Sequence, residues 1–114
     1  MSVKLTTRHV GDVTVMDATG RITLGEGAST FRDTLRELTR KGDKKLLLNL
    51  GDVSYIDSSG IGELVSGFTT VTNQGGQLKL LKLTKRVKDL LQITKLYTVF
   101  EVFEDEAEAV RSFT

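Results

Sequence analysis

The residues best suited to chemistry lie in one short segment, Asp57-Ser58-Ser59-Gly60-Ile61-Gly62. A carboxylate and two hydroxyls stand there directly before a stretch with helical spacing. A serine before a helix can cap it by accepting a backbone N–H bond, which is worth about 1 kcal/mol. Capping accounts for one serine only, and a glycine inside a helix costs about 1 kcal/mol. Gly60 and Gly62 therefore indicate a close approach, either by the protein's own sheet or by a partner.

Catalytic patterns built on serine or glycine fail in this chain. A serine-hydrolase elbow needs glycine two residues before its nucleophile, where Ser58 has Ile56. The single histidine, His9, belongs to a predicted edge strand, so we expect no serine–histidine pair. Gly25-Glu26-Gly27 and Gly60-Ile61-Gly62 lack the third glycine of a dinucleotide fingerprint, and no lysine completes a Walker loop. We expect no catalytic residue and no enzyme.

Composition narrows the function classes further. The 114 residues include no cysteine and one histidine, which excludes thiolate and imidazole-rich metal sites, and we expect no metal or cofactor. A net charge of +1 attracts nucleic acid weakly, so no direct nucleic-acid partner is expected. No apolar run approaches the ~20 residues of a membrane span, and the first residues do not read as a signal peptide. These features predict a cytoplasmic protein that does not contact a membrane.

The elements that position the segment follow from hydrophobic spacing and turn residues. Strands 3–10 and 13–19 form a hairpin around Gly11-Asp12. A glycine-bearing loop over 20–27 leads to a helix with Ser29 as its cap and Lys41-Gly42 as its end. The continuous apolar run 45–50 is typical of a strand buried on both faces, as in a parallel sheet.

The second half of the chain alternates helices with strands. The elements are a loop over 51–57, a helix capped by Ser58 or Ser59 and ended by 73–76, a strand over 78–83, a helix capped by Thr84, a short strand over 99–103 and a helix over 105–113. We interpret two charge runs, basic over 79–95 and acidic over 101–108, as solvated faces. The order predicts an α/β fold with a small mixed β-sheet, made of the N-terminal hairpin and parallel central strands, and about four α-helices.

Several of these segments together resemble a known family. Leu47-Leu48-Asn49-Leu50, the run from Val53 to Gly62, Gly75-Gly76-Gln77-Leu78 and the helix from Val87 to Leu91 are similar to the signature of STAS-domain anti-sigma factor antagonists. The similarity extends in order over nearly the whole chain. It implies a STAS fold, with residues 1–114 as a single STAS domain.

The resemblance also implies a function. In this family the serine directly after the aspartate, here Ser58, is phosphorylated by an anti-sigma factor that is also a serine kinase. The unphosphorylated form binds the anti-sigma factor and thereby releases a sigma factor, and a metal-dependent serine phosphatase resets the switch by acting on phosphorylated Ser58. Thr23 stands where family members often carry an aspartate that faces the partner. The implied partner-binding residues are Asp57, Ser58, Ser59, Gly60, Ile61, Gly62 and Thr23.

A second function stays open at this point. The main alternative is a non-enzymatic STAS subunit of a membrane transport complex of the lipid-transport ABC type, which shares the fold and would dock through the same helix. Co-purification with a transporter ATPase, without phosphate on Ser58, would identify that role.

Overall fold

A five-stranded mixed sheet forms the frame of the molecule, and the computed structural model describes residues 3–113 of it. The strands lie in sequence order: β1 (Val3–Val10), β2 (Val13–Ile22), β3 (Lys45–Ile56), β4 (Gln77–Leu83) and β5 (Val102–Phe103). β1 pairs with β2 in antiparallel register around Gly11 and Asp12, and the remaining pairs are parallel. The predicted fold class, a hairpin joined to parallel central strands, is confirmed.

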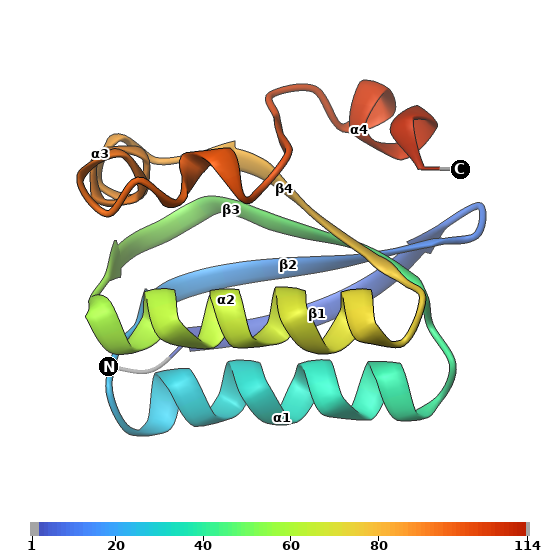
Figure 1. Ribbon diagram of the computed structural model, residues 1–114, viewed down its shortest axis with the longest axis horizontal. Helices are drawn as coiled ribbons and strands as arrows, with labels where there is room; N and C mark the ends of the chain where they lie inside the picture. The colour runs from blue at the N-terminus through green and yellow to red at the C-terminus, as the bar shows by residue number, and fades with distance from the viewer. Residues whose placement is uncertain (1–2, 114) are drawn as a thin grey trace.

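Helices cover both faces of this sheet. α1 (Glu26–Arg40) and α2 (Ser58–Asn73) lie side by side below it, and α4 (Glu106–Ser112) lies on the opposite face (Figure 1). α3 (Lys85–Ile93) lies near the end of β3 where α2 begins, and a short 3-10 helix, η1 (Leu96–Thr98), follows it. The four α-helices match the expected number.

The core has two parts because the central strands bury both of their faces. Leu46 and Leu48 of β3 belong to the larger cluster with the apolar residues of α1, α2 and α3, whereas Leu47 joins the smaller cluster under α4. All three leucines are fully buried, as the continuous apolar run predicts. The inward stripes expected for the helices are confirmed at Phe31 in α1 and Leu64 in α2.

Two strands run further than the sequence predicts. β2 ends at Ile22, and β3 continues to Ile56 through residues expected to form a loop. The extension holds because Val53 and Ile56 are buried and pair with Gly20 and Ile22 of β2. The loop prediction is therefore wrong for 51–56, and only Asp57 separates the end of β3 from the start of α2.

Other differences lie at element ends and at one lysine. The cap predicted at Ser29 is wrong, since α1 begins after Gly25 and Ser29 lies inside the helix. The end at Lys41 and the cap at Thr84 are confirmed. The predicted strand 99–103 shrinks to β5. Lys79 is 4% exposed, so it does not belong to a solvated basic face.

Candidate functional site

Asp57 caps α2, and both of its carboxylate oxygens are used. Oδ1 accepts the backbone N–H of Gly60 at 2.9 Å, and Oδ2 accepts the N–H of Leu24 at 3.0 Å. The second bond ties the helix start to the loop between β2 and α1. The sequence predicted a serine cap, but the carboxylate, with two acceptor oxygens, takes that place. Neither Ser58 nor Ser59 is needed as the N-cap.

The charge of Asp57 is stabilised by backbone donors. Partial burial acts to raise the pKa of the carboxyl, but the N–H groups of Gly60, Leu24 and Ser59 oppose this and hold the pKa below its ordinary value. Asp57 is therefore ionised at neutral pH. Because both oxygens already accept N–H bonds, the carboxylate is poorly placed to act as a base toward its neighbour Ser58.

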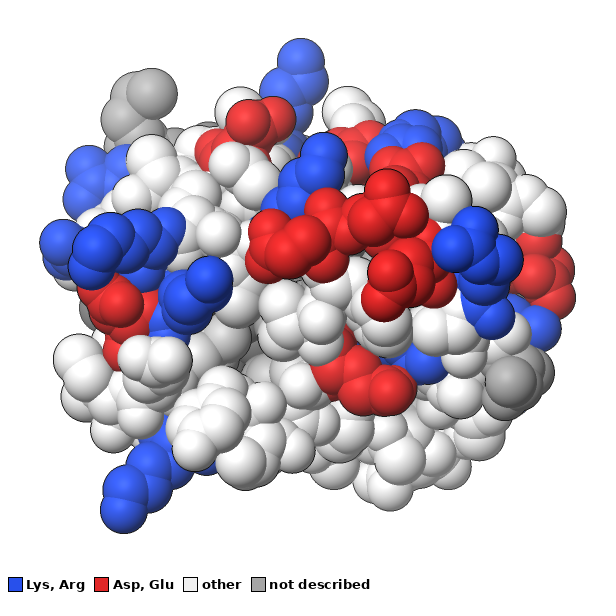
Figure 2. Space-filling view, turned by 90° about the horizontal axis from the view of Figure 1, so that it is seen from above, with Lys and Arg blue, Asp and Glu red and all other residues white. Residues whose placement is uncertain are grey.

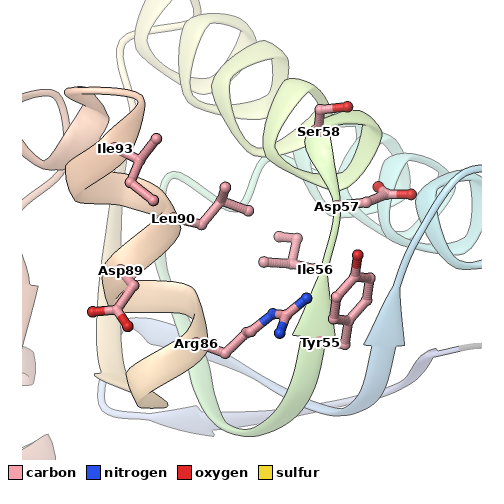
Figure 3. Close-up of a pocket in the computed structure, with 8 residues that line it drawn as sticks. All are labelled: Tyr55, Ile56, Asp57, Ser58, Arg86, Asp89, Leu90 and Ile93. Carbon is pink, nitrogen blue, oxygen red and sulfur yellow. The ribbon is translucent and has the colours of Figure 1, made fainter.

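Ser58 is the first residue of α2, and its side chain is exposed. Its hydroxyl makes no hydrogen bond to another residue within 3–113. Figure 3 shows this oxygen directed away from Leu90 and Ile93. The hydroxyl thus stands free at a helix N-terminus, where unpaired backbone N–H groups and the helix dipole favour negative charge.

The two glycines of the segment have different environments. A Cβ added at Gly60 would meet the carbonyl oxygen of Ile22 and would lie 2.6 Å from Cγ1 of Ile56. A Cβ at Gly62 would meet nothing within 4 Å, and Gly62 is exposed. Of the two alternatives that the sequence left open, packing against the protein's own sheet is confirmed for Gly60, and contact with a partner at Gly62 stays a prediction.

The structure brings together most of the residues expected to contact a partner. Thr23 is half-buried in the loop that Asp57 holds through Leu24, so both lie at the same end of the sheet as Ser58. Asp57 and Ser59 are half-buried and Gly62 is exposed. Ile61 differs, because its side chain is 5% exposed and packs into the larger core cluster.

A groove of about 500 Å³ runs beside Ser58, between α3 and the end of β3 (Figure 3). Its lining residues are Tyr55, Ile56, Asp57, Ser58, Arg86, Asp89, Leu90 and Ile93. The Arg86 guanidinium carbon lies 4.4 Å from the centre of the Tyr55 ring, and that of Arg21 lies 4.9 Å from it. Two cationic side chains therefore share one aromatic ring at the edge of the groove.

Sequence reasoning did not include this groove in the site. Its signal lies in α3, where Arg86, Leu90 and Ile93 recur at helical spacing on a face different from the core positions Val87 and Leu91. Ile93 and Leu24 are each 77% exposed, and both lie beside the Ser58 segment. Leu24 and Ile93 therefore add exposed apolar area beside the Ser58 segment.

Comparisons with known proteins agree with this architecture. The STAS domain family model matches residues 4–109. The anti-sigma-B factor antagonist of Bacillus subtilis (strain 168) is 40% identical over 75 residues, which cover 66% of this chain and 68% of that protein. Within residues 3–113, no helix has the length and apolar character that crossing a membrane requires.

Solved structures are similar over nearly the whole chain. An anti-sigma-factor antagonist (STAS) domain protein from Planctomyces limnophilus, 24% identical, has a TM-score of 0.78 and covers 95% of this chain and 96% of its own. The Bacillus protein SpoIIAA in its phosphorylated form, 18% identical, has a TM-score of 0.74 and covers 95% and 97%. At these identities the structures show the same fold.

Proposed function

Because this chain belongs to the STAS domain family, we propose that it is an anti-sigma factor antagonist that phosphorylation of Ser58 switches off. In the unphosphorylated state it binds an anti-sigma factor in the cytoplasm, and the sigma factor held by that protein is released. The chain acts as binder and substrate and performs no catalysis of its own.

The free hydroxyl of Ser58 is the observation that carries this proposal. The start of α2 is held by Asp57, so the helix does not depend on the Ser58 hydroxyl. An anti-sigma factor that is also a serine kinase can therefore modify it without unfolding the site. The kinase transfers the γ-phosphoryl group of ATP to Oγ, the hydroxyl proton leaves, and ADP is released. A serine phosphatase reverses the change by hydrolysis.

The phosphate is expected to act by blocking contact rather than by melting the helix. Phosphoserine carries about −1.5 to −2 charges at pH 7. At the N-terminus of α2 this charge is favoured by the helix dipole, and repulsion from Asp57 is screened at the surface. A partner surface that covers Ser58 would have to bury the added group, which costs free energy unless new donors meet it. No observation favours the transport-complex subunit.

Phosphorylation by a candidate anti-sigma factor kinase from the same genome tests the proposal. The chain is incubated with that kinase and ATP, and the modified residue is mapped by mass spectrometry. We expect one phosphate, on Ser58, and none on the Ser58→Ala variant, which should still bind the kinase. Ser59→Ala is the matched control and should still be phosphorylated. Phosphate on Ser59 in the wild-type chain would overturn the residue assignment.

A further inference from the structure

We propose that Arg21 and Arg86, which lie over Tyr55 beside Ser58, are specificity residues that select an anti-sigma factor with acidic side chains on its docking surface. The inference rests on the proposed function and adds the chemistry of the partner.

Three elements bring these residues together. Tyr55 comes from the end of β3, Arg21 from the end of β2 and Arg86 from the first turn of α3. The guanidinium carbons lie 4.9 Å and 4.4 Å from the centre of the Tyr55 ring. Stacking on an aromatic ring orients a planar guanidinium while leaving its N–H donors available. The cations are thus positioned before any partner arrives.

No carboxylate within residues 3–113 forms an ion pair with either arginine. Arg8, Arg32 and Arg40 each pair with an acidic side chain. Arg36 and Arg111 also make no ion pair, but neither lies over an aromatic ring.

The acids of the groove are already engaged. Asp57 accepts two backbone N–H bonds, and Asp89 pairs with Lys85 at 2.9 Å. The groove and its edge therefore carry three cationic side chains against two carboxylates, beside the positive end of the α2 dipole. The free charge at the docking surface is positive.

Basic and acidic side chains are also separated over the rest of the surface. Figure 2 shows basic side chains gathered at the left, over α3, and acidic side chains gathered in the centre, toward α4. An acidic partner surface is attracted to the α3 end and repelled from the acidic run 101–108. This distribution directs such a partner toward Ser58.

Ser58 and Arg86 line the same groove, so a partner that covers Ser58 and enters the groove also covers Arg86. A buried guanidinium without an anionic partner is costly, so a neutral or basic surface would bind poorly. Leu24 and Ile93, each 77% exposed, add apolar area to the same surface. The docking surface that fits is therefore a group of carboxylates within an apolar contact. Figure 3 shows the Arg86 guanidinium directed at Tyr55 and the Ser58 hydroxyl directed away from the groove. The Ser58 hydroxyl therefore does not occupy the N–H donors of Arg86, which are available to a partner.

The double variant Arg21→Glu, Arg86→Glu tests the inference. Both side chains are exposed, and an acid at the start of α3 is favoured by the helix dipole, so the fold should persist. The measurement is the dissociation constant for the kinase that phosphorylates the wild-type chain, at low and at high salt. We expect binding to weaken about tenfold or more at low salt, with a smaller difference at high salt.

Two further variants keep the test decisive. The double variant Arg21→Gln, Arg86→Gln removes the charge at nearly constant size and should show a smaller loss. Arg111→Glu makes one such charge reversal at an exposed arginine in α4, and its affinity should stay close to that of the wild-type chain. The inference would be overturned if the kinase binds and phosphorylates the wild-type chain and both double variants match the wild-type affinity and salt dependence. An equal loss in Arg111→Glu would also overturn it. A kinase that neither binds nor phosphorylates the wild-type chain would instead overturn the proposed function.

Discussion

Asp57 and Ser58 are adjacent but perform separate tasks. The carboxylate of Asp57 holds the backbone at the start of α2 and at the β2–α1 loop, while the hydroxyl of Ser58 makes no hydrogen bond to another residue within 3–113. Under the proposed function Ser58 is modified and restored repeatedly, and this separation would let its hydroxyl control binding while the fold stays constant.

Asp57→Ala should destabilise the protein without changing its core. The variant loses the N-cap acceptor and the bond to Leu24, so we expect the free energy of unfolding at pH 7 to fall by about 1–2 kcal/mol. Because the pKa of Asp57 is lowered in the folded state, its contribution is present above the unfolded pKa of about 4 and is lost as pH falls through the folded pKa.

Urea unfolding of wild type and variant between neutral and acidic pH measures this dependence. The difference between the two proteins should shrink below about pH 4. Asp52→Ala, which removes an exposed carboxylate from β3, is the control and should show little change at any pH. A difference that stays constant down to acidic pH would contradict the assigned role of the Asp57 charge.

Alanine at Gly60 and at Gly62 should have opposite effects on stability. At Gly60 the added methyl group meets Ile22 and Ile56, and overpacking of this kind costs about 1–3 kcal/mol. At Gly62 there is open space, so the helix gains up to about 1 kcal/mol from the better propensity of alanine. Thermal unfolding measures both, and a Gly62→Ala variant with normal stability but weaker kinase binding would locate the contact surface. Equal destabilisation at both positions would contradict these environments.

At the scale of elements, the spacing of apolar residues predicted most of the helices and strands. The apolar run 46–48 and most of the helix stripes are strong local signals that are buried as expected, although Val65, Phe68 and Leu90 are only half-buried. The second half of β3 was missed because Asp52 and Ser54 look like loop residues, although they alternate with buried Val53. The start of α1 was missed because its N-cap, Gly25, has no side chain that could signal capping.

The candidate site likewise has one part that the sequence predicted and one part that it did not. Asp57 to Gly62 form a continuous segment that the sequence singled out, although the cap is Asp57 rather than a serine, and Ile61, expected to contact a partner, is buried. The groove was not visible, because Arg21, Tyr55 and Arg86 belong to three elements that meet only through tertiary packing. Local patterns predict which residues begin a helix, but they do not show which distant helix lies beside it.

Lys79 anchors α4 to the sheet. Its Nζ donates to the carbonyl oxygen of Ser112 at 3.0 Å and to the hydroxyl at 2.9 Å, and it lies 4.8 Å from the centre of the Phe113 ring. Glu101 pairs with the same nitrogen at 3.2 Å. The buried charge is therefore fully engaged, and it links β4 to the end of the chain.

Lys79→Ala should loosen α4 selectively. The variant loses the stem packing and these bonds, so we expect unfolding to require about 2–4 kcal/mol less and amide exchange over residues 106–112 to accelerate. Lys79→Met keeps an apolar stem beside the Phe113 ring and should lose much less, because a well-packed apolar residue can replace a buried ion pair. Unchanged exchange in α4 of the alanine variant would show that the helix is held by other contacts.

At the scale of the whole molecule, the fold is expected to remain unchanged when phosphorylation adds negative charge to its surface. The phosphorylated chain should show amide shift changes confined to residues 57–62, to Leu24 and to the groove, with unchanged helix content. The reason is that a phosphate at a helix N-terminus is stabilised locally and strains no packed element. Two-dimensional NMR of both forms measures this, and broad changes reaching α4 or β1 would contradict a local block.

The most direct test of the central claim is the affinity of the anti-sigma factor kinase for the two forms of the chain. Isothermal titration of the purified kinase with unphosphorylated and with Ser58-phosphorylated protein gives both dissociation constants. The account predicts that phosphorylation weakens binding about a hundredfold or more, because the docking surface must bury a doubly charged group. Equal affinity for the two forms would contradict it, since Ser58 would then lie outside the surface that the partner covers.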